Sequence, residues 1–318
     1  MAARPLLSIV IPCYNEEEVF PLLRERTSGV MAAISPDFDV EVLFIDDGSR
    51  DRTWPLIEEY ARERPEVRGL SLSRNFGHQR ALTCGYDACQ GDVVVSMDAD
   101  LQDPPDLILE MLERWKLGAD VVYAVRRRRQ DDTFFKRATA AAFYALFRRA
   151  AGPYVEDNVG DFRLLSRRAL SAFNQMRETH RYIRGMVGWM GFQVDRVYFD
   201  RPARAAGVTK YPFMKMFGFA IDAIVSFSAS PLRLAYYGAL MISALVFVYW
   251  GYVLFLHFAG QRPLVPGWTS LLLTTTLFGC SNLICLGIMG EYIGRIFDEA
   301  KRRPLYLVKN ESPRRPAE

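Results

Sequence analysis

Residues 92–105 read DVVVSMDADLQDPP, an apolar run that leads directly into Asp98, Asp100 and Asp103, with Gln102 between them. The apolar part has the composition of a fully buried strand. Carboxylates spaced this closely repel one another, and each resists leaving water unless a positive group holds it. The stretch therefore predicts a strand whose carboxyl end carries a cation site.

The first 200 residues alternate short β-rich runs with amphipathic stretches. Strands are expected at 7–13, 40–46, 67–73, 92–98 and 120–125. Helical patterns lie near 16–34, 51–63, 78–90 and 104–116. Alternation of this kind predicts an α/β domain with a largely parallel sheet.

Polar loops follow four of the expected strands. They read CYNEE at 13–17, DDGS at 46–49, DADLQD at 98–103 and RRRR at 126–129. Ligands of such sheets bind beyond the carboxyl ends of the strands. The four loops are therefore expected to converge on one crevice.

The spacing of these residues excludes several common sites. Counted from Asp98, an EF-hand loop would need Gly at its sixth position and Glu at its twelfth, where the chain has Asp103 and Leu109. The GxGxxG of a dinucleotide fold is missing after the first strand, and a P-loop motif is absent. What remains is a hard divalent ion, Mg²⁺ or Mn²⁺, held by one or two carboxylates and shared with the phosphates of a ligand. A solvated acidic cluster that caps a helix is the alternative.

Composition narrows the class of protein. The chain has 318 residues, 50% of them hydrophobic, and its net charge of +3 is too small to argue for nucleic-acid binding. Its five cysteines form no CxxC pair, which favours free thiols and a reducing compartment. The histidines His78, His180 and His257 show no ligand spacing, so none is predicted to bind zinc or to act in catalysis. The apolar run near the N-terminus is too brief for a signal peptide, which predicts a cytoplasmic amino-terminal domain.

Two uncharged segments of about 23 residues each, 234–256 and 268–290, are long enough to cross a bilayer as helices. Aromatic residues that suit an interfacial belt lie towards their ends: Tyr236, Tyr237, Trp250, Tyr252 and Trp268. The linker between the segments carries only Arg262, whereas several basic residues follow the second segment. The positive-inside rule then places both termini in the cytoplasm. A pair of buried core helices is the alternative.

The chain is expected to divide into a cytoplasmic α/β domain, juxtamembrane interfacial helices, a two-helix transmembrane domain and a basic cytoplasmic tail, at 1–210, 211–232, 233–292 and 293–318. The juxtamembrane part is apolar but interrupted by charges and proline, which favours helices lying in the interface plane. Residues 309–318 are expected to be disordered. The run RRPLYLV at 302–308 is strand-like and could pair with another subunit to give a homo-oligomer.

Seven motifs together resemble a known family. They read SIVIPCYNEEE (8–18), FIDDGSRDRT (44–53), SRNFGHQRAL (73–82), MDADLQDPP (97–105), GDFRLLSRRAL (160–170), AGVTKYP (206–212) and GEYIGRI (290–296). Over nearly the whole chain they look like a family 2 glycosyltransferase of GT-A fold. More narrowly, the chain resembles the bacterial polyprenyl-phosphate glycosyltransferases, the bactoprenol (undecaprenyl-phosphate) glucosyltransferase group, with dolichyl-phosphate mannose synthase as a more distant relative.

The resemblance implies a Rossmann-like, mostly parallel GT-A sheet and a role for each matching residue. Nucleotide-sugar binding is implied for Pro12, Tyr14, Glu16, Asp47, Asp98 and Ala99. Metal binding on the donor diphosphate is implied for Asp98, Asp100 and Gln102. Contacts to donor or acceptor phosphates are implied for Arg126, Arg137, Arg163, Arg204 and Lys210. A solvated or membrane-facing charge is the alternative for four of them: Arg126, Arg137, Arg204 and Lys210.

The resemblance also makes Asp161 a catalytic candidate, together with Asp98 and Asp100, because the family places its catalytic aspartate at this point of a late strand. A protein hydroxyl acceptor would need a general base. A lipid phosphate does not, because its second pKa of about 6 leaves an anionic oxygen near neutral pH. Our hypothesis is therefore that Asp161 orients the acceptor or stabilises charge on the sugar. An aspartate that caps a turn is the alternative.

The predicted function is inverting transfer of one sugar, with UDP-glucose as the predicted donor, to undecaprenyl phosphate at the cytoplasmic face of the bacterial inner membrane. The product would be a lipid-linked sugar donor for cell-surface glycosylation. A GDP-mannose transferase like dolichyl-phosphate mannose synthase is one alternative. A processive polysaccharide synthase would carry a QxxRW motif, which is missing. A non-catalytic scaffold or transporter should have lost part of the acidic motif, which is intact here.

Overall fold

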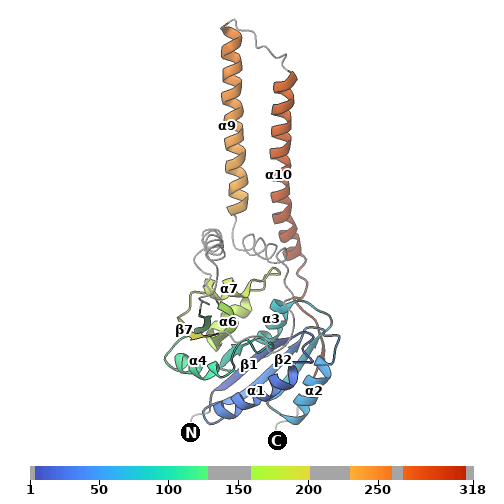
Figure 1. The fold of residues 1–318 in the computed structure, drawn as a ribbon, viewed down its shortest axis with the longest axis vertical. Coiled ribbons are helices and arrows are strands. Elements are labelled where there is room, and N and C mark those ends of the chain that lie inside the picture. Colours follow the sequence, from blue (N-terminus) through green and yellow to red (C-terminus); the bar gives the residue numbers. More distant parts are fainter. Residues whose placement is uncertain (1–3, 128–158, 201–229, 260–267, 313–318) are drawn as a thin grey trace. The chain divides into compact units, whose positions relative to one another are not determined.

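The computed structural model describes residues 4–127, 159–200, 230–259 and 268–312 (Figure 1). The chain divides into two compact units, Met1–Met216 with Pro304–Glu318, and Phe217–Arg303. The first unit contains the sheet, and the second contains the two long apolar helices. Residues 211–229, most of the segment expected as interfacial helices, lie outside the described residues.

In the described part of the first unit, a mixed sheet of eight strands has the order β7-β5-β6-β4-β1-β2-β3-β8. The strands are β1 (Leu6–Cys13), β2 (Asp39–Asp46), β3 (Val67–Leu72), β4 (Val93–Ser96), β5 (Val121–Arg126), β6 (Val159–Ser166), β7 (Val194–Phe199) and β8 (Val308–Glu311). Strand β1 pairs in parallel with β2 and β4, β2 with β3, and β5 with β7. Strand β6 lies antiparallel between β4 and β5, and β8 lies antiparallel to β3. The α/β fold and the five strands predicted from the sequence are confirmed.

Six helices of the first unit are described: α1 (Phe20–Ile34), α2 (Thr53–Glu63), α3 (His78–Ala88), α4 (Leu107–Lys116), α6 (Arg167–Gln175) and α7 (Ile183–Trp189). Helices α1 and α2 begin later than predicted. The reason is that the residues before them bond to one another, as where the Glu17 amide donates to Asp51 Oδ2 at 3.2 Å. The polar residues expected to start a helix are used instead to join two loops.

Apolar side chains from the strands are packed against helices on both faces of the sheet. On one face, Leu7, Ile9 and Ile11 of β1 pack in a cluster with residues of α1, α2 and α4. On the other face, Val10 meets α3 at Gly85, where a side-chain carbon would lie 2.1 Å from Val10 Cγ1. Burial on both faces explains why the strands read as nearly continuous apolar runs. Some polar side chains are buried within the strands, Ser8 and Glu41 among them, whereas the acidic loop of the candidate site follows the end of β4.

The C-terminal segment corrects two expectations from the sequence. Residues 309–312, the start of the tail expected to be disordered, are ordered, and the strand lies at Val308–Glu311 instead of 302–308, where it pairs with β3 of the same chain. The pairing continues past the strand, because the Gly69 amide donates to Ser312 Oγ at 2.8 Å and the Ser312 amide donates to the Gly69 oxygen at 2.9 Å. Leu305 is buried at the start of the segment. The segment therefore covers the otherwise unpaired edge of β3, a common way to protect an exposed strand.

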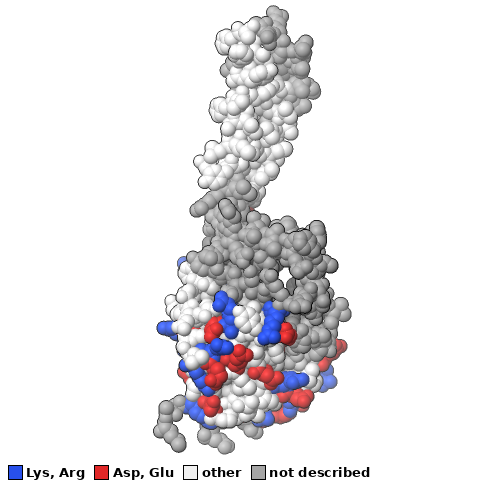
Figure 2. Space-filling view, turned by 60° about the vertical axis from the view of Figure 1, so that its left-hand side comes forward, with Lys and Arg blue, Asp and Glu red and all other residues white. Residues whose placement is uncertain are grey.

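The second unit contains α9 (Ser230–Phe258) and α10 (Trp268–Ala300). By length and composition both helices could cross a membrane, over Ala235–Tyr252 and Leu273–Ala300. None of the residues in these two windows is buried, which is unlike the core helices considered as the alternative. Figure 2 shows that Lys, Arg, Asp and Glu gather on the surface of the first unit, whereas α9 and α10 are uncharged over most of their visible length. All five cysteines of the chain are free thiols, as predicted.

Candidate active site

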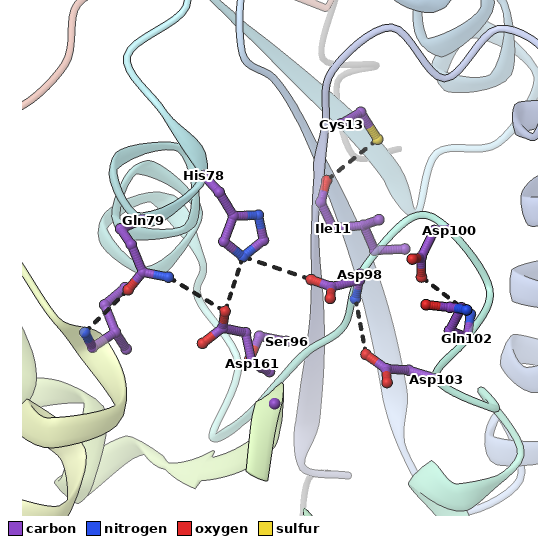
Figure 3. Close-up of polar contacts among 12 residues, drawn as sticks. Ile11, Cys13, His78, Gln79, Ser96, Asp98, Asp100, Gln102, Asp103 and Asp161 are labelled. Atoms are coloured by element: carbon purple, nitrogen blue, oxygen red, sulfur yellow. Dashed lines mark hydrogen bonds and ion pairs between the residues drawn. The ribbon is translucent and has the colours of Figure 1, made fainter. Parts of the chain in front are cut away.

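The acidic loop folds into a tight turn directly after β4. Leu101 adopts a φ of 54°, in the left-handed region. The Gln102 amide donates to Asp100 Oδ1 at 3.1 Å, and the Asp98 amide lies 3.5 Å from Asp103 Oδ2. The turn places the three carboxylates around one short stretch of backbone (Figure 3).

A fourth aspartate approaches this loop from β6. Antiparallel pairing aligns Ser96 of β4 with Arg163 of β6, and the Ser96 hydroxyl donates to the Asp161 backbone oxygen at 2.6 Å. His78, the first residue of α3, lies between the two carboxylates (Figure 3). Its Nε2 is 3.6 Å from Asp98 Oδ1 and 3.2 Å from Asp161 Oδ2. The acidic loop and β6 therefore share one site.

Three further side chains bind the Asp161 carboxylate, which is only 6% exposed. Arg163 Nη2 donates to Oδ1 at 2.7 Å. Arg184 of α7 donates from Nε to Oδ1 at 3.3 Å and from Nη2 to Oδ2 at 3.1 Å. Gln79 Nε2 donates to Oδ2 at 3.3 Å. One buried carboxylate thus organises residues from α3, β6 and α7.

The ionisation of Asp161 and His78 follows from this arrangement. Burial alone would raise the pKa of Asp161, but Arg184, His78 and Arg163 outweigh it and hold the pKa well below its ordinary value. Burial would lower the pKa of His78, but the hydrogen bond to Asp161 and the charge of Asp98 raise it to about 9. Asp161 is therefore a carboxylate and His78 a cation near neutral pH. A carboxylate with a depressed pKa is a weak proton acceptor.

The carboxylates of the acidic loop are suited to bind a cation. Asp98 Oδ1 and Asp103 Oδ1 are buried and accept no hydrogen bond. Burial raises the pKa of Asp98, an effect that His78 opposes and Asp161 reinforces. Burial and the neighbouring Asp98 raise the pKa of Asp103 to about 7, while Arg126 opposes the rise. Because neither carboxylate is well stabilised as an anion by the protein, a bound cation would relieve both.

The donor set suits Mg²⁺ or Mn²⁺ shared with a ligand. In residues 4–127, 159–200, 230–259 and 268–312, no group of three or more His, Cys, Asp or Glu side chains is placed to hold a metal by itself. Asp98, Asp100 and Gln102 nevertheless offer oxygen ligands on one turn. Mg²⁺ is commonly bound through one or two carboxylates, with phosphates supplying further ligands. The residues fit an ion that arrives with a phosphorylated substrate.

Two loops beside the acidic turn are fastened to each other. The Asn15 amide donates to Ser49 Oγ at 2.9 Å, and the Arg50 amide donates back to Asn15 Oδ1 at 2.9 Å. The Glu16 amide donates to Thr53 Oγ1 at 2.8 Å. These hydrogen bonds connect the loops that follow β1 and β2, and β4 is the neighbouring strand of β1. Nucleotides bind to α/β sheets at this place, beyond the carboxyl ends of the strands.

Comparison with known proteins identifies the family. Residues 8–173 match the model of the family described as Glycosyl transferase family 2. The chain belongs to glycosyl transferase family 2. An uncharacterized glycosyltransferase of Bacillus subtilis, YkcC, is 45% identical over 95% of this chain and 93% of its own length. The bactoprenol glucosyl transferase of Shigella phage SfV is 39% identical over 96% of this chain and 98% of its own length.

Solved structures were compared as well. A glucosyl-3-phosphoglycerate synthase from Mycobacterium tuberculosis in complex with Mn²⁺, UDP and glucosyl-3-phosphoglycerate is 18% identical, covers 70% of this chain and 80% of its own, and has a TM-score of 0.46. A mannosyltransferase from Pyrobaculum calidifontis in complex with GDP-Man and Mn²⁺ is 16% identical, covers 90% of this chain and 88% of its own, and has a TM-score of 0.45.

The residues implied for nucleotide binding in this glycosyltransferase lie on the fastened loops and the acidic turn. Pro12 is buried within β1, and Tyr14 just beyond it is 36% exposed. Glu16 is half-buried on the loop that follows β1, and Ala99 is buried in the acidic turn. The structure thus groups these residues around one end of the parallel strands.

Asp47 has a structural task that the sequence did not indicate. Its Oδ1 accepts the Phe76 amide at 2.7 Å, and its Oδ2 accepts the Gly77 amide at 2.9 Å. Burial raises the pKa of Asp47, and these two amide hydrogen bonds oppose the rise. The carboxylate therefore fixes the turn that places His78 at the site.

The residues implied for phosphate contacts fall into three groups. Arg126 ends β5, with Nη2 at 3.6 Å from Asp103 Oδ1, and it can pass close over Gly160 because that residue has no side chain. Arg163 is fully buried and uses Nη2 on Asp161 and on the Gly160 oxygen, so it supports Asp161 from within the protein. Arg137, Arg204 and Lys210 lie outside the described residues.

Sequence reasoning missed three residues of this glycosyltransferase site: His78, Gln79 and Arg184. His78 was set aside because no metal-ligand spacing surrounds it, although it begins a helix at the edge where the other loops end. Gln79 follows it in the same motif. Arg184 belongs to a helix far along the chain, and no spacing relates it to Asp161. Only the folded arrangement brings the three together.

Proposed function

We propose that this glycosyltransferase transfers glucose from UDP-glucose to undecaprenyl phosphate, with inversion, at the cytoplasmic face of the bacterial inner membrane. The observation that carries the proposal is the junction of Asp98 and Asp161 through His78, at 3.6 and 3.2 Å. On one side of His78 lies the carboxylate turn, which suits a metal and a diphosphate. On the other side lie the arginines around Asp161, which suit a second anion. The relatives named bactoprenol glucosyl transferase support a glucosyl group and a bactoprenol acceptor.

On the donor side, Asp98, Asp100 and Gln102 would hold Mg²⁺ or Mn²⁺ against the diphosphate. The ion would neutralise the charge that develops on the leaving nucleoside diphosphate. Pro12, Tyr14, Glu16, Asp47 and Ala99 would form the site for the base and ribose. The hydrogen bonds between the two loops support this assignment, because a binding site whose parts are already connected has less to order when its ligand binds.

On the acceptor side, the lipid phosphate would attack the anomeric carbon directly. Its oxygen forms the new bond as the bond from that carbon to the diphosphate oxygen breaks, and one displacement inverts the centre. The attacking oxygen is already anionic near neutral pH. Asp161, whose depressed pKa makes it a weak base, would stabilise positive charge on the sugar and orient its cationic neighbours. Arg126, Arg137, Arg204 and Lys210 would add contacts to phosphates.

The two apolar helices support a membrane location for the reaction. Spans at α9 and α10 would keep the protein beside the bilayer that holds the prenyl tail of the acceptor, with the catalytic domain and both termini in the cytoplasm. Residues 211–232 would lie in the interface plane. The product would serve as a lipid-linked sugar donor for cell-surface glycosylation. Formation of a homo-oligomer stays a prediction.

The test is a transfer assay with the full-length protein in membranes. Undecaprenyl phosphate would be incubated with labelled UDP-glucose, other UDP-sugars or GDP-mannose, with and without a chelator. We expect one lipid-linked product, from UDP-glucose, that disappears with the chelator and returns with Mg²⁺ or Mn²⁺. A product from GDP-mannose alone would favour the mannosyl alternative. Binding of UDP without any lipid product would favour a non-catalytic scaffold.

A further inference from the structure

The side chains around Asp161 carry more positive charge than that carboxylate needs. We call Asp161, His78, Gln79, Arg163 and Arg184 the Asp161 cluster. It combines one carboxylate with two guanidinium groups, so it keeps a net positive charge even without the imidazole of His78. Each additional buried charge has a desolvation cost, so the second arginine on this carboxylate leaves positive charge that a bound anion would balance.

Two positively charged members of the cluster are exposed to solvent. Arg163 is fully buried and Asp161 is 6% exposed. Arg184 is 34% exposed and His78 is 38% exposed. An anion arriving at the cluster would therefore meet Arg184 and His78, while Arg163 holds Asp161 from behind.

Arg184 is oriented to receive such an anion. Its Nε and Nη2 are used on Asp161, at 3.3 and 3.1 Å, which fixes the plane of the guanidinium. Within the described residues its Nη1 has no partner, and it is not a buried atom. A guanidinium has five N–H donors in one plane, so Arg184 can hold Asp161 on one side and an oxyanion on the other.

The proposed reaction has two phosphorylated substrates, and each needs its own positive charge. The diphosphate of the donor would be balanced by the metal at Asp98 and Asp100. That metal cannot also serve the acceptor, which must attack the sugar from the face opposite the diphosphate. Asp161 lies on the opposite side of His78 from Asp98 (Figure 3). The two arginines bound to Asp161 supply a separate positive charge there.

From this geometry we infer that Arg184, held in place by Asp161, binds the phosphate of the lipid acceptor. The inference rests on the proposed function and names the residue that recognises the acceptor head. Arg184 holds non-bridging oxygens of the phosphate while another oxygen forms the bond to the anomeric carbon. Arg184 gives up no proton in this step, and the leaving group is the nucleoside diphosphate.

The test uses the full-length protein in detergent and compares Arg184→Gln, Arg184→Lys and Arg24→Gln with the wild type. Arg24 is a matched control, because it also pairs with a carboxylate, that of Glu63, and is 36% exposed. The readouts are the KM for undecaprenyl phosphate, the KM for UDP-glucose, the affinity for UDP with Mn²⁺ measured by calorimetry, and the thermal midpoint. A short-chain prenyl phosphate serves as a second acceptor, because it has the same head and little tail.

We expect Arg184→Gln to raise the KM for both acceptors by about 10-fold or more, the scale of losing one hydrogen bond to a charged group. The UDP affinity and the KM for UDP-glucose should change by less than about 2-fold. Arg184→Lys, which keeps the charge but loses the planar fork, should have a smaller effect on the acceptor KM. Arg24→Gln should match the wild type.

Two results would overturn the inference. One is an acceptor KM that stays at the wild-type value in folded Arg184→Gln. The other is a loss of UDP affinity as large as the loss for the acceptor. If Arg184→Gln does not fold, Arg184→Lys decides, since an unchanged acceptor KM in that variant also contradicts the role. Failure of the proposed function looks different, because the wild type would then bind UDP with Mn²⁺ yet glycosylate neither acceptor.

Discussion

The Tyr306 hydroxyl donates a hydrogen bond to Asp87 Oδ2 at 2.8 Å and so ties the segment after α10 to the end of α3. Asp87 is also held by Arg177 Nη1, at 2.8 Å to Oδ1 and 2.9 Å to Oδ2. Helix α3 carries His78 and Gln79 at its other end, where both contact Asp161. The C-terminal segment therefore braces the helix that supplies two residues of the site.

Tyr306→Phe should lower the stability of the protein by about 1 kcal/mol, because Asp87 loses one of its donors in a partly buried place. For a domain of this size the thermal midpoint should fall by about 2–4 °C. Thermal unfolding of the full-length protein in detergent measures the effect. Tyr198→Phe is the control, since Tyr198 is 53% exposed, and its midpoint should stay at the wild-type value. Equal midpoints for the two variants would show that the Tyr306 hydrogen bond does not stabilise the protein.

Asp161→Asn should change how stability depends on pH. Burial opposes ionisation of Asp161, yet Arg184, His78 and Arg163 hold its pKa well below the ordinary value. An aspartate in the unfolded chain has a pKa of about 3.9. The ionised group thus stabilises the fold fully above about pH 4, and this stabilisation is lost as pH falls through the folded pKa.

The thermal midpoint of the wild type should therefore fall more steeply below about pH 4 than that of Asp161→Asn, which should already be less stable at pH 7 by about 3 kcal/mol because its arginines lack a counter-charge. Midpoints measured from pH 7 to pH 3 give both slopes. Asp37→Asn, at a side chain that is 69% exposed, should follow the wild type. Parallel curves for Asp161→Asn and the wild type would mean that the cluster does not stabilise the fold.

The parallel part of the sheet could be predicted because each strand is a short apolar run that is recognisable from its own sequence. Strand β4 reads as three valines and a serine, and the acids that follow it cannot remain in the core. The position of Asp98 at a strand end follows from this contrast alone. The same reasoning placed the other polar loops at one edge, because parallel strands end on the same side.

The centre of the site could not be predicted in the same way. Asp161 reaches Asp98 only because β6 inserts antiparallel between β4 and β5, and this strand order is not written in any local pattern. Arg184 joins them from α7, 23 residues after Asp161 in the chain. Strand β8 was misjudged for a related reason, since its polar residues look disordered until the free edge of β3 is there to pair with them.

Two glycine substitutions should have opposite effects. Gly48 has a φ of 69°, and a Cβ there would lie 2.5 Å from the Arg74 carbonyl carbon, so Gly48→Ala combines backbone strain with a clash. We expect a loss of about 2 kcal/mol or more. Gly29 lies on an exposed turn of α1, where an added Cβ would have nothing within 4 Å, so Gly29→Ala should gain about 0.5–1 kcal/mol. Thermal midpoints that move in the same direction would contradict this account of the two positions.

Asp98→Asn should separate stability from activity. Asp98 Oδ1 is buried and accepts no hydrogen bond, and burial together with Asp161 raises its pKa against the pull of His78. Removing the charge should therefore raise the thermal midpoint of the metal-free protein by about 2–4 °C. The same change removes a carboxylate ligand, so Mn²⁺ should no longer strengthen UDP binding and sugar transfer should fall by about 100-fold or more.

Three measurements on Asp98→Asn check this expectation: the midpoint without metal, the UDP affinity with and without Mn²⁺, and the transfer rate. Glu110→Gln is the control, because Glu110 lies on α4 with its side chain 48% exposed and should leave all three unchanged. A variant that loses transfer and also unfolds earlier would indicate that Asp98 supports the fold. A variant whose UDP binding still responds to Mn²⁺ would place the metal on other residues. The expected combination, a more stable protein without metal response, is what a carboxylate kept for a ligand should produce.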